Sequence, residues 1–159
     1  MENQSPARQL ARFMARFDPK IAALARTARA KMRKRLPRAV EMVYDNYNAL
    51  VIGFGPTERA SEAIVSIVVY PRWVSVCFIQ GAHLPDPQGV LEGGGNQVRH
   101  IRLDDGAAVL DTPAIRALLS EALEFSGEPF DGKGRLVIKA ISAKQRPRRA
   151  GKTYRSRLG

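Results

Sequence analysis

Cysteine and histidine are scarce in this chain of 159 residues, which holds one cysteine and two histidines. The single cysteine, Cys77, excludes a disulfide within the chain and any metal site built from several cysteines. It lies in an apolar run, residues 74–79, where we expect a core thiol rather than a nucleophile, because a reactive cysteine needs exposure and a lowered pKa. His83 and His100 form no ligand motif with a neighbouring cysteine or histidine, which argues against a zinc site.

Long hydrophobic runs are also missing. No window approaches the roughly 18 consecutive apolar residues of a membrane span. Arg8, Arg12 and Arg16 interrupt the N-terminal segment at every turn, unlike the apolar region of a secretory signal. Apolar residues still make up 45% of the chain, which is enough for a folded core. Together with the single cysteine, these features favour a folded cytoplasmic protein.

Acidic residues are absent from one whole end of the chain. Residues 132–159 hold ten Lys/Arg and no acid, a net charge of +10. Residues 1–38 hold 11 Lys/Arg and two acids, a net charge of +9. The middle, residues 39–131, holds five Lys/Arg against 13 acids, a net charge of −8. The overall charge of +11 therefore describes an acidic centre between two basic ends.

Apolar residues at three- and four-residue spacing predict two N-terminal helices, near residues 6–17 and 19–34. Between them, Asp18 is a suitable helix cap and Pro19 fits the first turn of a new helix. A proline at the next break favours a third helix over residues 37–44. The apolar face of residues 6–17 has two interpretations, packing on the domain or contact with an anionic membrane.

Short runs of β-branched residues predict an antiparallel sheet of about five strands. The first three are joined by connections too short for a parallel crossover. The expected strands are residues 49–54, 63–70, 73–80, 98–103 and 136–141. A further helix is expected to begin at Thr112, and the fold class is α+β.

These elements suggest three parts. Residues 1–35 form a basic N-terminal helical extension, residues 36–142 an α+β domain, and residues 143–159 a basic flexible tail. No catalytic residue is predicted in any of them, so we expect a protein that is not an enzyme.

Several segments resemble one known family. They are VYDNYNAL at 43–50, YPRWV at 70–74, GAHLPDP at 81–87, VRHIRL at 98–103 and IKAISAKQRPRR at 138–149. Over roughly residues 30–145 the chain resembles the bacterial YdhG-like domain family, whose members are largely uncharacterised. The resemblance implies a compact antiparallel sheet with helices, similar in outline to frataxin-type proteins, and hence iron handling in some relatives. It implies no catalytic residues.

The basic ends lead to our first hypothesis, a non-enzymatic binding or adaptor protein that contacts nucleic acid or another polyanion. Cationic side chains neutralise phosphates and release counterions, and without base-reading motifs such binding is tolerant of sequence. The alternative is that the basic ends fold back on the acidic domain of the same chain or of a second copy. The predicted nucleic-acid contacts are Lys144, Arg146, Arg148, Arg149, Lys152, Arg155 and Arg157.

The second hypothesis is iron binding or iron delivery by the acidic face of the central domain. Carboxylate oxygens are suitable ligands for hard cations and for Fe²⁺. The predicted ligands are Asp86, Asp104 and Asp105, which fall in loops or at strand ends. Solvated surface acids are the simpler interpretation of the same residues.

Overall fold

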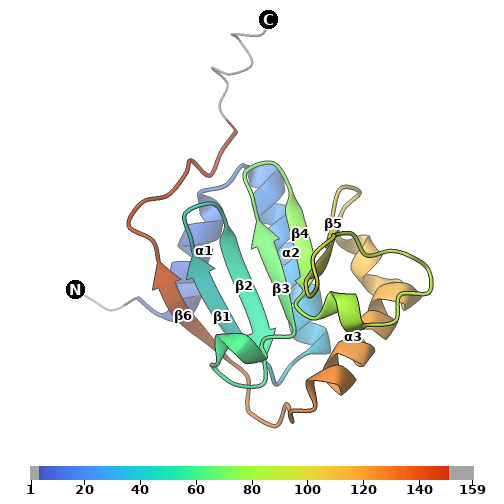
Figure 1. Cartoon of the computed structure of the whole chain (residues 1–159). Helices are drawn as coiled ribbons and strands as arrows, with labels where there is room; N and C mark the ends of the chain where they lie inside the picture. The colour runs from blue at the N-terminus through green and yellow to red at the C-terminus, as the bar shows by residue number, and fades with distance from the viewer. Residues whose placement is uncertain (1–3, 151–159) are drawn as a thin grey trace, which may run out of the picture.

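The structure is a computed structural model that describes residues 4–150. Within those residues, three α-helices and a six-stranded sheet make an α+β fold (Figure 1). The α+β class is confirmed, and the sheet has six strands rather than five. In this part of the chain no helix is both long and apolar enough to cross a membrane.

The helices are α1 (Pro6–Ala15), α2 (Pro19–Arg35) and α3 (Pro113–Ser126). The strands are β1 (Val40–Asp45), β2 (Leu50–Gly55), β3 (Val65–Val69), β4 (Val74–Phe78), β5 (Arg99–Arg102) and β6 (Arg135–Ile141). Three short 3₁₀ helices complete the order, η1 (Ala60–Glu62), η2 (Gly81–His83) and η3 (Ala107–Asp111).

The helices begin where proline and a preceding cap indicate. The Ser5 hydroxyl accepts a hydrogen bond from the first turn of α1 at 3.2 Å, and Thr112 caps α3 in the same way at 3.5 Å. Asp18 precedes α2 without a capping hydrogen bond from its side chain, so Pro19 carries the start of that helix. The predicted break between the first two helices is thereby confirmed.

The predicted third helix over residues 37–44 is wrong, because this segment contains β1. Glu41, Val43 and Asp45 point to one face of the strand, and the residues between them point to the other, which is the two-residue period of a sheet. Almost all of the strand is buried, so its side chains are not split into an apolar and a polar half. A strand buried on both faces shows little alternation of polar and apolar residues. The segment therefore lacked the usual strand pattern, and Pro37 favoured a helix instead.

The strand order is β5-β4-β3-β2-β1-β6. Every neighbouring pair from β1 to β5 is antiparallel, as the short connections predict. The last pair differs, because β6 lies parallel to β1. A bulge interrupts that pairing, since Val43 is opposite Ile138 whereas Tyr44 is opposite Ala140.

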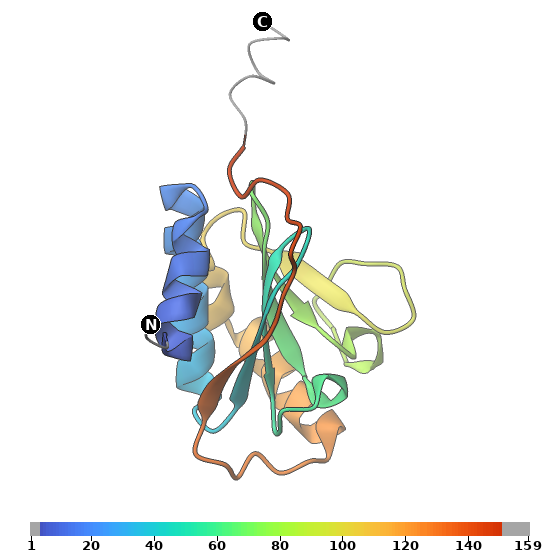
Figure 2. The ribbon, with the colours of Figure 1, turned by 90° about the vertical axis from the view of Figure 1, so that its left-hand side faces the viewer.

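The core lies between the sheet and its helices, with α1 and α2 along one face of the sheet (Figure 2). Leu10, Phe13 and Phe17 belong to the same buried cluster as the strands and α3. Complete burial of side chains of this size stabilises a fold by roughly 1.5–3 kcal/mol each. The apolar face of α1 is therefore packed on the domain, as the first of the two interpretations of residues 6–17 expected.

Candidate nucleic-acid interface

The C-terminal basic segment is anchored by a buried ion pair. Arg148 donates from Nη2 to the Asp45 carboxylate at 2.9 Å, and their side chains are only 1% and 2% exposed. The same nitrogen donates to the carbonyl of Asn46 at 2.6 Å, and Nη1 reaches the carbonyl of Tyr47 at 3.4 Å. The guanidinium also lies 5.6 Å from the ring centre of Phe17. Arg148 thus joins residues 142–150 to the turn between β1 and β2.

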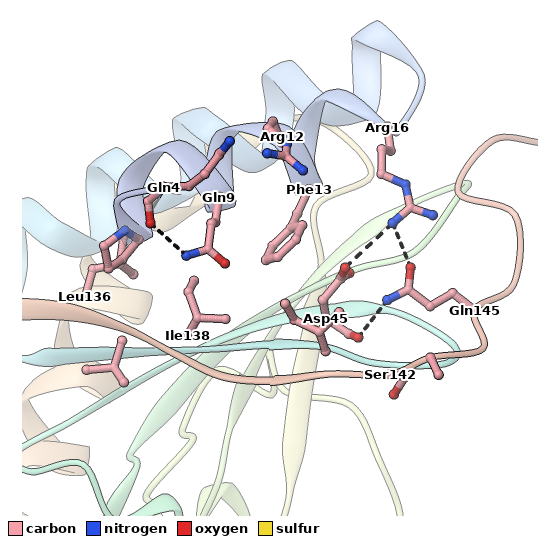
Figure 3. A pocket seen from close by; sticks show the side chains of 14 residues that line it. Gln4, Gln9, Arg12, Phe13, Arg16, Asp45, Leu136, Ile138, Ser142 and Gln145 are labelled. Atoms are coloured by element: carbon pink, nitrogen blue, oxygen red, sulfur yellow. Dashed lines mark hydrogen bonds and ion pairs between the residues drawn. The ribbon is translucent and has the colours of Figure 1, made fainter. Parts of the chain in front are cut away.

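A second arginine approaches the same carboxylate from the C-terminal end of α1. Arg16 lies 3.6 Å from Oδ2 of Asp45 and donates to the side-chain oxygen of Gln145 at 2.7 Å. Gln145 in turn donates to the carbonyl of Asp45 at 2.8 Å (Figure 3). The two basic ends of the chain therefore meet at one end of the sheet.

Surface cations gather around this anchor. Arg149 donates to the carbonyl of Arg16 at 3.2 Å and lies 3.9 Å from the carboxylate of Asp18. The Arg146 guanidinium lies 5.7 Å from the ring centre of Tyr47, whose side chain is 46% exposed. Both arginines keep much of their surface in solvent.

The predicted nucleic-acid residues divide into three groups. Lys144, Arg146 and Arg149 are exposed, as a contact with phosphate requires. The prediction of a nucleic-acid contact does not suit Arg148, because its pairing with Asp45 removes the side chain from the surface. The remaining three, Lys152, Arg155 and Arg157, lie outside the described residues.

The turn between β3 and β4 adds aromatic side chains to this end of the sheet. Tyr70 and Trp73 stack with ring centres 4.6 Å apart, and the Arg102 guanidinium lies 4.5 Å from the Trp73 ring. A surface hollow runs between this turn and the C-terminal segment. Its lining residues are Asn48, Tyr70, Pro71, Arg72, Trp73, Arg146, Pro147, Arg149 and Ala150.

These aromatic residues were not predicted to belong to the site, although the sequence holds a signal for it. Strands β1 to β4 alternate in direction, so the β1–β2 and β3–β4 turns must lie at the same end of the sheet. Tyr47 and Trp73 occupy those two turns. That Arg146 lies beside Tyr47 and lines the same hollow as Trp73 depends further on the position of the C-terminal segment, which no local pattern predicts.

Two of the three acids proposed as iron ligands, Asp86 and Asp104, have other partners. Both carboxylate oxygens of Asp86 accept backbone N–H groups of the loop that follows, each at 3.0 Å. Asp104 pairs with Arg102 at 3.1 Å. Across residues 4–150 no three His, Cys, Asp or Glu side chains gather in an arrangement that would hold a metal ion. The predicted set of Asp86, Asp104 and Asp105 is therefore not brought together.

Cys77 is half-buried in β4. Burial raises the pKa of its thiol, and a hydrogen bond with Ser66 only partly opposes that shift. A raised pKa lowers the fraction of thiolate at neutral pH, which is the reactive form. The position does not suit a nucleophile.

We expect Cys77 to react slowly with a disulfide reagent. At pH 8 the native protein should react with 5,5′-dithiobis-(2-nitrobenzoate) at least about tenfold more slowly than the protein in concentrated guanidinium, since both exposure and thiolate are reduced in the fold. Absorbance at the thiolate product band gives the two rates. Equal rates would mean that the thiol is accessible and ionised in the native state.

Comparisons of the chain with models of protein families, with curated proteins and with solved structures give no match. The resemblance to YdhG-like domains therefore stays a prediction. Any function has to be argued from the site.

Proposed function

We propose that this protein is a non-enzymatic nucleic-acid-binding module that uses the end of the sheet where its basic termini meet. The observation that carries the proposal is that Arg146 and Arg149 line one surface hollow with Trp73, while the exposed ring of Tyr47 lies beside Arg146. Cations for phosphates and an exposed ring for bases are the two components of a sequence-tolerant site.

The charge at this end supports the proposal. The carboxylate of Asp45 is buried against Arg148. Its negative charge is balanced by Arg148, with Arg16 3.6 Å away, and not by Arg146 or Arg149. Asp18 contacts Arg149 only at 3.9 Å, with both side chains substantially exposed. An exposed pair of this kind is weak, so Arg149 can exchange Asp18 for a phosphate at little cost.

The aromatic side chains favour single strands over duplex. Trp73 is covered by Tyr70 and Arg102, whereas Tyr47 is 46% exposed with Arg146 beside it. An exposed ring stacks on an unpaired base and contributes about 1–3 kcal/mol per base, but the bases of a duplex are already stacked. We therefore assign phosphate contacts to Arg146 and Arg149 and base stacking to Tyr47.

Binding of a fluorescein-labelled oligothymidylate, followed by anisotropy over a range of salt concentrations, tests the proposal. Affinity should fall as salt rises, with a log–log slope of about −0.7 per phosphate contact on a single strand. The double variant Arg146→Ala/Arg149→Ala should make the slope shallower by about 1.4, because two contacts are lost.

Two further variants separate the local site from general charge. Lys34→Ala/Arg38→Ala removes the same charge from exposed residues at the opposite end of β1 and should change the slope little. Tyr47→Ala should weaken binding without changing the slope, since stacking releases no counterions. An affinity that does not change with salt concentration, or an equal change of slope in the two double variants, would contradict the proposed site.

A further inference from the structure

The two edges of the sheet differ in how they are covered. At the β5 edge, Glu92 in the preceding loop exchanges two backbone hydrogen bonds with His100, each at 2.8 Å. At the other edge, β6 pairs with β1 on one side, and within residues 4–150 no strand pairs with its other side. An uncovered edge strand presents backbone N–H and C=O groups that can pair with another chain.

A groove of about 1110 Å³ lies beside this open edge, between β6 and α1 (Figure 3). Leu136, Ile138 and Ile141 line its strand side. The bulge next to Ile138 brings Ile141, three residues later, opposite Asp45 on the helix-facing side of the sheet. Ile141 is 54% exposed, which is high for a side chain of this size and marks an apolar surface without cover.

The helix side of the groove is cationic. Arg12 on α1 and Arg16, which caps its C-terminal end, line the groove together with Gln9 (Figure 3). Among the described residues that line the groove, Asp45 is the one acid, and its carboxylate is held by Arg148 at 2.9 Å, with Arg16 more distant at 3.6 Å. An occupant with negative side chains is therefore favoured over a neutral or basic one.

The spacing of the two arginines matches an extended chain. Residues four apart on a helix are separated by about 6 Å along its axis. Alternate residues of a strand point to the same face and are separated by about 6.6–6.8 Å. A strand added to the open edge of β6 would therefore direct alternate side chains towards Arg12 and Arg16 in register.

We propose that β6 and this groove bind an extended segment of a partner protein that carries acidic residues at alternate positions. The segment adds a seventh strand by backbone pairing with β6, and its acidic side chains pair with Arg12 and Arg16. A second copy of this chain fits less well, because pairing β6 with β6 would bring two sets of these arginines to one interface. The proposal is independent of nucleic-acid binding.

A fluorescein-labelled, acetylated Glu-Val-Glu-Val-Glu-Val-Glu peptide serves as the probe, with anisotropy as the readout on the full chain. The same peptide with lysine in place of glutamate tests charge. A version with proline at the central position tests backbone pairing, since proline has no N–H to donate. We expect both controls to bind at least about tenfold more weakly than the acidic peptide.

The matched variants lie on one helix. Arg12→Glu should weaken binding of the acidic peptide at least about tenfold, whereas Arg8→Glu, an exposed residue that does not line the groove, should leave it nearly unchanged. Amide hydrogen exchange should show new protection along β6 when the peptide is bound.

Three results would overturn the proposal. The first is binding of the proline peptide as tight as that of the acidic peptide, which would mean contact without strand pairing. The second is an equal loss of binding in Arg8→Glu and Arg12→Glu. The third is dimerisation of the free protein through β6. Sedimentation velocity of the wild type, with and without peptide, detects the last of these.

Discussion

Replacing Arg148 with alanine is expected to destabilise the fold by about 3–5 kcal/mol, because it leaves the Asp45 carboxylate buried without its principal partner. The loss is not that of one hydrogen bond. Arg148 also donates to the carbonyls of Asn46 and Tyr47, so the variant removes two further hydrogen bonds between the β1–β2 turn and the C-terminal segment. Urea unfolding followed by circular dichroism measures the free energy of unfolding.

The neighbouring arginine supplies the control. Arg149→Ala removes the same charge one position later, but its pair with Asp18 is exposed, so we expect a loss below about 1 kcal/mol. The double variant Arg148→Met/Asp45→Leu should be more stable than Arg148→Ala alone, since it removes the unpaired charge together with its partner. A loss near that of Arg149→Ala would show that Asp45 finds another partner, with Arg16 the nearest.

Gly134→Ala is the second substitution with a large expected effect. Gly134 precedes β6 with φ of +74°, and an added Cβ would lie 2.5 Å from the carbonyl oxygen of Pro37. The left-handed conformation alone costs an L-residue roughly 1–2 kcal/mol. The contact with a backbone atom should raise the total to about 2–4 kcal/mol, because either β6 or the segment before β1 must move.

Gly127→Ala separates the two contributions. Gly127 ends α3 with a similar φ of +69°, but an added Cβ there meets nothing within 4 Å. We expect its cost to be that of the backbone conformation only. Unfolding of both variants by urea gives the difference, which measures the close approach to Pro37. Equal losses would show that the Pro37 segment yields easily and does not fix the position of β6.

Most helices and strands could be predicted because their signals are local. Prolines and caps set the helix starts, and β-branched runs between turns set five of the strands. β1 was missed because Pro37 resembles a helix start and because both faces of the strand are buried. The parallel pairing of β1 with β6 could not be predicted, since residues 46–134 separate the two strands in the sequence.

The candidate site shows a similar limit. Arg146, Arg148 and Arg149 are alike in sequence context, yet only Arg148 is buried. Its burial depends on Asp45, which is 103 residues away and lies in the strand that the sequence did not reveal. The basic composition of the segment therefore predicted its charge but not which arginine is structural and which faces solvent.

The distance between Asp45 and Arg148 along the chain has a consequence for folding during synthesis. Strands β1 to β5 leave the ribosome before residue 148 is made, and domains form as their parts emerge. Until Arg148 arrives, the Asp45 carboxylate must remain hydrated, because burying it alone costs several kcal/mol. We therefore expect β1 to become fully buried around Asp45 only once the C-terminal segment reaches it.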